Sequence, residues 1–353
     1  MSPKHTCVNN KSKMKMKAFR AIQQSYFPLP AHIFWPVPAF GTSEFVNLVT
    51  LVGIIVAVAL VGVDLVLRVA HESKSQRRRN PKTLDGATKV DLKLSKKEQI
   101  SPDTIRLTFA LPSPQHVLGL PVGQHVGLSY VDAKTGDRVE RPYTPVSSDD
   151  DLGVAVFVIK VYKPCEKFPE GGKVSQYLDS LVPGKDVCTF SGPKGMKQYA
   201  GRGTFLVKRL KSQGGGFEKR AGIKRVGMIA GGSGITPMLQ VSRAILDGGD
   251  KGVKMNLLFA NQTEADILCR EEIEADVEKH GAEKFSAHYT LDRPPKKWAY
   301  SSGFITKEMI QEHMPPPGKG TQILICGPPP MLKFAVLPAL EALGYTKDMY
   351  LTW

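Results

Sequence analysis

The feature of this sequence that most restricts its fold is the regular alternation of short apolar runs and helix-like segments after Val226. The apolar runs have the length of buried strands, and the segments between them have helical spacing. Such strands and helices form a parallel sheet, whose ligands bind at the carboxyl ends of the strands. We therefore predict an α/β domain over residues 226–353. Its expected strands are Val226–Ala230, Met255–Ala260, Phe285–Leu291 and Gln322–Cys326, and its expected helices are Thr236–Leu246, Ile267–His280, Thr306–His313 and Met331–Leu343.

Residues 90–200 have a different pattern, in which short apolar runs are separated mainly by turns. Thr104–Leu111 alternates apolar and polar residues with the period of a half-buried strand, and Val126–Tyr130 and Val154–Val161 are further short runs. Strands at this spacing favour an antiparallel barrel. The prediction is thus an α+β chain of two domains, an antiparallel β-barrel followed by a parallel α/β domain, with a basic connection between them over residues 201–225.

An apolar run, Phe45–Leu67, lies ahead of both domains and carries no charge from Phe45 to Val63. About 20 apolar residues span the hydrocarbon core, so we predict a transmembrane helix in the lipid bilayer over residues 45–67. The basic linker over residues 68–89 follows, and positive charge near a span favours the cytoplasmic side. The alternative for the run is a buried core helix. The basic leader over residues 1–44 fits either a mitochondrial presequence or a disordered tail.

Positive charge is concentrated near the N-terminus. The formal net charge is +15, but residues 1–43 contain six Lys/Arg and no acid, and residues 68–82 contain six Lys/Arg and one acid. The two domains are therefore only mildly basic, which argues against nucleic-acid binding. The scattered cysteines suit a reducing compartment and exclude the usual iron–sulfur spacings, so we expect no metal site. They are Cys7, Cys165, Cys188, Cys269 and Cys326.

The stretch Arg141-Pro142-Tyr143-Thr144-Pro145-Val146-Ser147 combines a cation, an aromatic ring and hydroxyls. The prolines favour extended backbone, in which Arg141 and Tyr143 share a face. A guanidinium suits a diphosphate, and a tyrosine ring can lie against a flat ligand. The alternative is a surface edge strand with an Arg–Tyr stack.

Further along, Gly171-Gly172-Lys173-Val174-Ser175 leads into the helix-like segment Val174–Leu181. Free backbone N–H groups at such a helix start bind anions. The alternative is an ordinary glycine-rich turn.

Three loops follow expected strands in the α/β domain. Gly231-Gly232-Ser233-Gly234-Ile235-Thr236-Pro237 departs from the usual dinucleotide fingerprint, because Pro237 stands where the third glycine belongs. Asn261-Gln262-Thr263-Glu264-Ala265-Asp266 ends in an acid that can accept a hydrogen bond from a ribose or cap a helix from Ile267. Cys326-Gly327-Pro328-Pro329-Pro330-Met331 is stiffened by prolines, although a lone Cys is often only a small buried side chain.

In this order, the motifs resemble those of the NADH–cytochrome b5 reductase family, within the ferredoxin–NADP reductase superfamily. The resemblance covers roughly Val90 to Trp353 and implies a six-stranded FAD-binding barrel followed by an NADH-binding domain. Many members end in Phe where this sequence has Trp353. The catalytic residues implied are Thr144, Lys160, Thr236 and Cys326. The cofactor-binding residues implied are Arg141, Pro142, Tyr143, Thr144, Val158, Lys160, Gly171, Gly172, Lys173, Val174, Ser175, Gly232, Gly234, Thr236, Pro237, Asp266, Gly327, Pro328 and Met331.

The function implied is a membrane-anchored flavoenzyme that takes a hydride from NADH and passes single electrons to cytochrome b5. The sequence contains no haem-binding His-Pro-Gly-Gly segment, so the acceptor is expected to be a separate protein. One alternative is an NADH-dependent reductase of quinones or other small acceptors with the same site. Another is a non-catalytic membrane tether. The catalytic part is expected to face the cytosol from the endoplasmic reticulum or the mitochondrial outer membrane.

Overall fold

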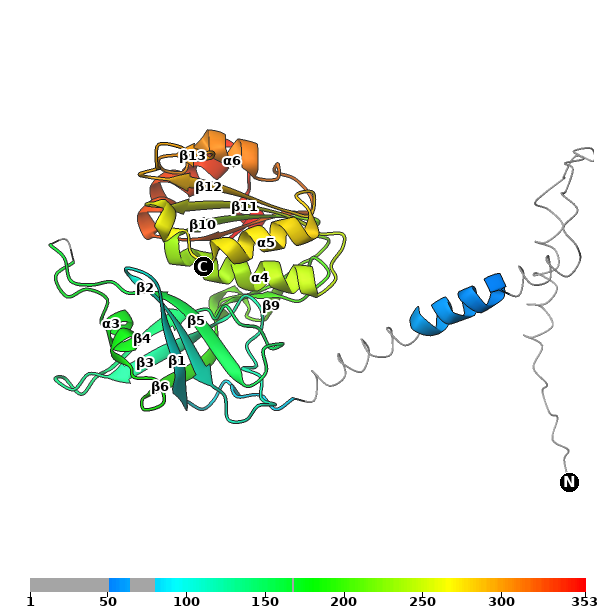
Figure 1. Cartoon of the computed structure of the whole chain (residues 1–353). Coiled ribbons are helices and arrows are strands. Elements are labelled where there is room, and N and C mark those ends of the chain that lie inside the picture. Colours follow the sequence, from blue (N-terminus) through cyan, green and yellow to red (C-terminus); the bar gives the residue numbers. More distant parts are fainter. Residues whose placement is uncertain (1–50, 64–79, 167) are drawn as a thin grey trace, which may run out of the picture. The chain divides into compact units, whose positions relative to one another are not determined.

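The computed structural model describes residues 51–63, 80–166 and 168–353, which fall into two units, residues 1–71 and 72–353 (Figure 1). In the first unit, residues 51–63 form a helix with exposed apolar side chains such as Ile55 and Val58. The rest of the predicted span over residues 45–67, and the leader over residues 1–44, lie outside the described residues. Within the described ranges, no helix has the length and apolar character needed to cross a bilayer.

The first domain of the second unit is built on a six-stranded antiparallel sheet, which confirms the predicted antiparallel architecture. The strand order is β4-β3-β6-β1-β2-β5, so β4 and β5 are its edges. The strands are β1 (Val90–Ser101), β2 (Thr104–Ala110), β3 (His125–Val131), β4 (Arg138–Tyr143), β5 (Val154–Lys160) and β6 (Val187–Lys194), and α3 (Lys173–Ser180) packs against β3 and β4.

The alternation read from the sequence accounts for the core of this sheet. Ile105, Leu107 and Phe109 of β2 are fully buried, and the rings of Phe109 and Phe190 meet edge to face. β1 is longer than its apolar part, because its polar second half continues to pair with β2 as far as Ser101↔Thr104. Polar residues gave no period-two signal there, so only the pairing partner reveals this half of the strand.

The second domain contains the predicted parallel sheet, with strand order β13-β12-β11-β10-β14-β15 and only parallel pairs. Because β10 is followed by β11 on one side and neighbours β14 on the other, the switch point of the topology lies between β10 and β14. The strands are β10 (Arg225–Gly231), β11 (Lys254–Asn261), β12 (Phe285–Leu291), β13 (Ser301–Ser302), β14 (Thr321–Cys326) and β15 (Tyr350–Thr352).

Helices cover both faces of this sheet (Figure 1). α4 (Ile235–Asp247) and α5 (Arg270–His280) lie on one face, and α6 (Lys307–His313) and α7 (Leu337–Ala342) lie on the other. α5 begins three residues later than predicted, because Glu264–Asp266 forms a separate 3-10 turn and Cys269 has a φ of 56°. The predicted helix Met331–Leu343 is divided into a π-helical turn, Met331–Val336, and α7, whose Pro338 lacks the N–H that a continuous helix needs.

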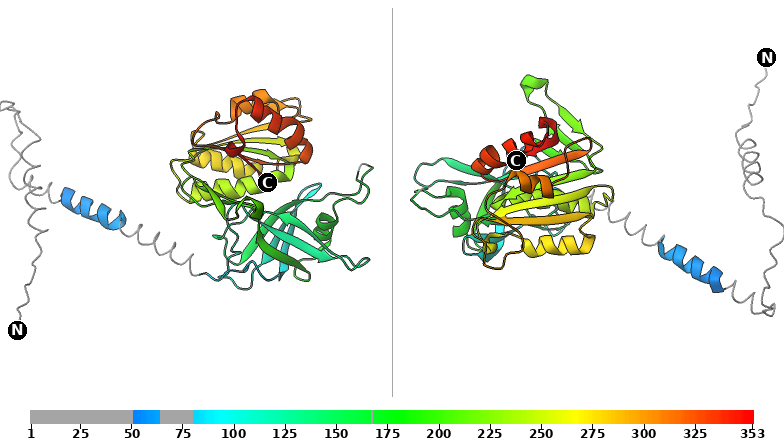
Figure 2. Two further views of the ribbon diagram at one scale, coloured as in Figure 1. Left: turned by 180° about the vertical axis from the view of Figure 1, so that it is seen from behind. Right: turned by 90° about the horizontal axis from the view of Figure 1, so that it is seen from above.

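The segment predicted as a connection, residues 201–225, contains a β-hairpin. β8 (Phe205–Lys208) pairs antiparallel with β9 (Phe217–Arg220) and with β7 (Lys197–Tyr199), and a 3-10 turn, Lys211–Gln213, lies near its tip. The right-hand view of Figure 2 shows this hairpin projecting from the rest of the second unit. Three consecutive glycines at the tip, Gly214–Gly216, have positive φ angles, which suits a tight return of the chain.

Candidate functional site

Two of the predicted loops meet at the switch point of the parallel sheet. β10 and β14 pair at Ala230↔Cys326, so the loop that begins at Gly231 lies beside the loop that begins at Cys326. A Cβ on Gly234 would lie only 2.2 Å from the carbonyl oxygen of Cys326. A glycine is therefore required at position 234 for these two loops to pack together.

The loop that begins at Gly231 also forms the start of α4. Gly232–Gly234 is a 3-10 turn that leads directly into α4, and no side chain caps the helix. Thr236 and Pro237 lie in the first turn, where the hydroxyl of Thr236 donates to the carbonyl of Ser233 at 3.3 Å. Uncapped N–H groups at a helix start near the switch point can accommodate the pyrophosphate of a dinucleotide.

Cys326 stands at the end of β14 and is partly buried. Burial raises the pKa of its thiol to about 11, against the opposing effect of the Lys197 ammonium. The side chain is therefore a neutral thiol near pH 7. The following Gly327 and the side chain of Met331 pack against Gly231 and each other, which keeps the proline loop close to the glycine loop.

The second group of predicted residues lies at the edge strand β4 and at α3. Arg141 and Pro142 are exposed, Tyr143 is half-buried, and Thr144 is buried just after the strand ends. The Arg141 guanidinium donates to the carbonyl of Glu140 at 2.8 Å, and it forms no ion pair within the described residues. Because α3 packs against β4, the structure brings Arg141's strand and the glycine turn before α3 together.

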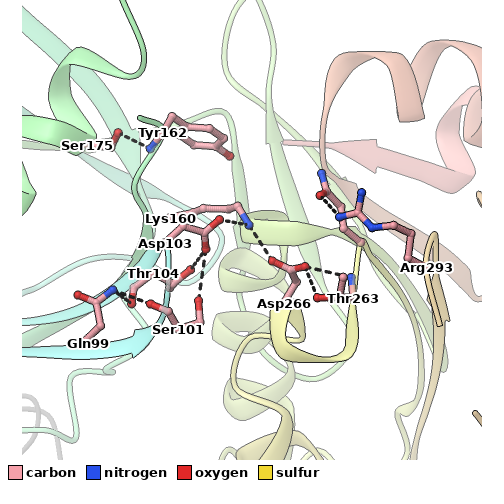
Figure 3. A network of polar contacts seen from close by, with 11 residues as sticks. Gln99, Ser101, Asp103, Thr104, Lys160, Tyr162, Ser175, Thr263, Asp266 and Arg293 are labelled. Carbon is pink, nitrogen blue, oxygen red and sulfur yellow. Dashed lines mark hydrogen bonds and ion pairs between the residues drawn. The ribbon is translucent and has the colours of Figure 1, made fainter. Parts of the chain in front are cut away.

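The turn before α3 depends on glycine. Gly171 has a φ of +61°, and a Cβ there would lie 2.5 Å from the carbonyl oxygen of Tyr162. Gly172 is the N-cap and leaves the first N–H groups of α3 uncapped by a side chain. Ser175 stabilises this turn. Its hydroxyl donates to the carbonyl of Gly172 at 2.9 Å and accepts from the N–H of Tyr162 at 3.1 Å, the second of which Figure 3 shows.

The other residues predicted at this turn point in two directions. Val174 is buried in the core of the antiparallel domain. Lys173 is exposed and forms an ion pair with Glu170 at 3.1 Å. The turn therefore offers uncapped N–H groups and an exposed lysine, a combination that fits a phosphate group.

β5 carries predicted residues toward the second domain. Val158 and Lys160 share a face of this strand, and Val158 belongs to a cluster of buried side chains that also contains Met238 and Val241 of α4. The two domains therefore share a core. β5 also lies against the turn Gly232–Gly234.

Lys160 lies between two carboxylates, as Figure 3 shows. Its ammonium is 2.8 Å from Asp103 in its own domain and 3.0 Å from Asp266 in the other. Burial opposes the charge of Lys160, but the hydrogen bonds to the two acids outweigh it, so the pKa of Lys160 is raised. Burial likewise opposes the charge of Asp266, and hydrogen bonds from Thr263 and Lys160 outweigh it, so that pKa is lowered. Both groups are charged at neutral pH and link the two domains.

The alternative in which Asp266 caps a helix from Ile267 is wrong, because α5 begins only at Arg270. Asp266 is instead the last residue of the turn Glu264–Asp266. Its carboxylate accepts from the N–H of Thr263 at 3.0 Å and from the Thr263 hydroxyl at 2.6 Å. These bonds hold the acid at the carboxyl end of β11, beside Lys160.

Two features at the carboxyl edge of the parallel sheet were not predicted from the sequence. Asn261, the last residue of β11, is only 6% exposed, and within the described residues neither atom of its amide group has a hydrogen-bond partner. Asp292 and Arg293, just after β12, bond through their backbone N–H groups to Asn261 and Gln262. An unpaired buried amide costs stability unless a ligand satisfies it. The sequence signal that could have identified Asn261 is its position as a polar residue at the end of an apolar strand.

Comparisons with known proteins agree with this architecture. The sequence matches two protein-family profiles, "Oxidoreductase FAD-binding domain" over residues 91–199 and "Oxidoreductase NAD-binding domain" over residues 228–336. It is 53% identical over 272 residues to NADH-cytochrome b5 reductase 2 of Gallus gallus, covering 76% of this chain and 87% of that protein. It is 47% identical over 319 residues to NADH-cytochrome b5 reductase 1 of Homo sapiens, covering 90% and 98%. The structure resembles the cytochrome b5 reductase domain of Ulva prolifera nitrate reductase, with a TM-score of 0.70 and 39% identity over 77% of this chain and 100% of that one.

Proposed function

Because this chain belongs to the NADH-cytochrome b5 reductase family, we propose that it is an FAD enzyme that oxidises NADH and passes single electrons to cytochrome b5. The observation that carries the proposal is the meeting of the Gly231 loop, the Cys326 loop and β5 at the junction of a flavin domain and a dinucleotide domain. Bound FAD supplies the conversion between the two-electron donor and a one-electron acceptor.

The residues of the antiparallel domain are proposed to hold FAD. The guanidinium of Arg141, which forms no ion pair within the described residues, and the uncapped N–H groups at the start of α3 would bind its pyrophosphate from two sides, with Gly171 and Gly172 shaping the turn. Pro142, Tyr143 and Thr144 would line the flavin ring, and Val158 would support it from β5. Lys173, Val174 and Ser175 would keep the turn and the helix start in place.

The residues of the parallel domain are proposed to hold NADH. Gly232, Gly234, Thr236 and Pro237 form the helix start that would receive its pyrophosphate, and Gly327, Pro328 and Met331 would close the other side of the nicotinamide with Cys326. Asp266 would accept a hydrogen bond from a ribose hydroxyl, and Lys160 would bind NADH between the domains.

The anchor and the compartment are also proposals. The apolar run over residues 45–67 would span a bilayer, in keeping with the exposed apolar side chains of the helix over residues 51–63. The basic residues that follow would keep the two domains on the cytosolic side of the endoplasmic reticulum or the mitochondrial outer membrane.

The test is acceptor-dependent turnover of the purified full chain in detergent. With NADH, we expect a yellow protein that reduces cytochrome b5 and ferricyanide and that prefers the cytochrome to quinones. A colourless protein without NADH oxidation would leave only the tether function. Fast reduction of quinones with no reduction of cytochrome b5 would favour the small-acceptor reductase.

Deletion of residues 1–80 should leave a soluble, yellow enzyme whose ferricyanide turnover equals that of the full chain. The chain from Pro81 onward is already attached to the antiparallel domain, because Pro81, Thr83 and Leu84 bond to residues 117 and 118. Sedimentation and the flavin absorbance of the purified fragment measure this outcome. An insoluble or flavin-free fragment would show that the segment over residues 45–67 is part of the catalytic core.

Replacement of Asp266 with Ser should raise the ratio of kcat/KM for NADPH to that for NADH about tenfold, which corresponds to roughly 1.4 kcal/mol. The change removes a negative charge that repels a 2′-phosphate, and it frees Lys160 from one of its two acids. Steady-state kinetics with both nucleotides measure the ratio. Glu264→Ser is the matched control, because Glu264 lies in the same turn but pairs with Arg270. If the ratio of kcat/KM for NADPH to that for NADH is unchanged in Asp266→Ser, Asp266 does not select the nucleotide and acts only as an ion-pair partner of Lys160 between the domains.

A further inference from the structure

Side chains of the parallel-sheet domain bind both backbone groups of Gly123, in the turn before β3. The N–H of Gly123 donates to the side-chain oxygen of Gln240 on α4 at 2.7 Å, and its carbonyl accepts from the indole N–H of Trp353 at 2.9 Å. Gly123 has a φ of +91°, and a Cβ there would lie 3.1 Å from the carbonyl oxygen of Lys197. The turn is therefore fixed on three sides, and Trp353 provides one of the two side-chain bonds.

Trp353 is also attached to the strand that leads to Cys326. It follows β15, which pairs with β14, and its backbone N–H donates to the carbonyl of Ile325 at 2.9 Å. The residue therefore joins the flavin-domain turn to the backbone position just before Cys326.

Lys197 of β7 completes this contact. Its ammonium donates to the carbonyl of Thr352 and lies 5.6 Å from the centre of the Trp353 ring. Burial lowers the pKa of Lys197. Within the described residues, Lys197 has no carboxylate partner. The Thr352 carbonyl and the Trp353 ring therefore offset the cost of partly burying the Lys197 charge.

We propose that Trp353 is a positioning residue, whose indole holds the β14 edge and the Cys326 loop at a fixed distance from the flavin domain during hydride transfer. The inference rests on the proposed function, because it assigns hydride transfer to this junction. Phe at this position keeps most of the ring but has no N–H donor for the Gly123 carbonyl. Misplacement of reacting groups by about 1 Å can cost on the order of 100-fold in rate. We therefore expect loss of the bond between the Trp353 indole and the Gly123 carbonyl to slow hydride transfer more than it weakens NADH binding.

The test compares Trp353→Phe and Trp353→Ala with the parent enzyme in anaerobic stopped-flow measurements of flavin bleaching by NADH. The limiting rate at saturating NADH should fall about tenfold in Trp353→Phe and about 100-fold in Trp353→Ala. The dissociation constant for NADH should change by less than about twofold, since the binding loops remain. Trp298→Phe is the matched control, because it removes an indole N–H that donates within the parallel-sheet domain, to Ser301 at 2.8 Å.

Hydrogen exchange gives a second readout that does not depend on turnover. The Gly123 amide should exchange faster in both Trp353 variants and not in Trp298→Phe, whereas amides in the β1–β2 ladder should keep the parent rate. An unchanged limiting rate, with or without a lower Tm, would overturn the positioning role. If NADH does not bleach the flavin of the parent enzyme, the proposed function itself is contradicted. The hydrogen-exchange data would still decide whether Trp353 holds the two domains together.

Discussion

The Arg141→Ala variant should purify with little FAD and should bind added FAD on the order of 100-fold more weakly than the parent. Hydrogen bonds to charged groups contribute about 1.5–3 kcal/mol each, and a guanidinium can make two such bonds to a diphosphate. The structure supports this choice, because Arg141 is exposed on the edge strand β4, next to α3, and pairs with no acid in the described residues. The ratio of flavin to protein absorbance after gel filtration, and titration of the apoprotein with FAD, measure the loss.

Two further variants make this prediction specific. Arg138→Ala removes the same charge from the same strand, but Arg138 points to the other face and donates to the Ser129 hydroxyl at 2.9 Å, so flavin content should stay near the parent value. Arg141→Lys should give an intermediate affinity, because an ammonium keeps the charge without the paired donors. Full flavin occupancy of Arg141→Ala at low FAD would show that the pyrophosphate lies elsewhere.

Reversal of Lys208, Arg209 and Lys211 to Glu should lower kcat/KM for cytochrome b5 at low salt by at least about tenfold. The three side chains are exposed on the projecting β8–β9 hairpin, and charge complementarity steers association by about 10- to 1,000-fold. Arg220 of β9 is left unchanged, because its side chain is only 16% exposed and already pairs with Glu218. Ferricyanide turnover should be nearly unchanged, since a small acceptor needs no protein docking.

The salt dependence separates docking from a general loss of activity. The Debye length falls from about 10 Å at 0.1 M to about 3 Å at 1 M ionic strength, so the parent rate with cytochrome b5 should fall steeply with salt. The hairpin variant should show a flatter curve. A control with the same change in charge is the reversal of three exposed lysines of the parallel-sheet domain, Lys307, Lys319 and Lys347. Equal losses in both variants, or no loss in the hairpin variant, would place docking on another surface.

The sequence by itself determined the parts of this protein that depend on local patterns. Period-two alternation located β2, alternating strands and helices predicted the parallel sheet, and glycine and proline spacing located the loops after β10 and β14. These features can be predicted from sequence because their causes are local. Burial of one face sets the period of a strand or helix, glycine permits a positive φ, and proline lacks an N–H, and each effect extends over only a few residues. They also bring the Gly231 and Cys326 loops together, because parallel neighbouring strands end at the same edge.

Tertiary structure decided the features that join segments far apart in the chain. The second half of β1 is a strand only because β2 pairs with it, and residues 201–225 form a hairpin rather than a plain connection. Lys160 meets Asp266, and Trp353 meets Gly123, only when the two domains share a core. Those partners are polar, lie up to 230 residues apart and follow no period, so the energy of each contact depends on where the folded domains place the groups.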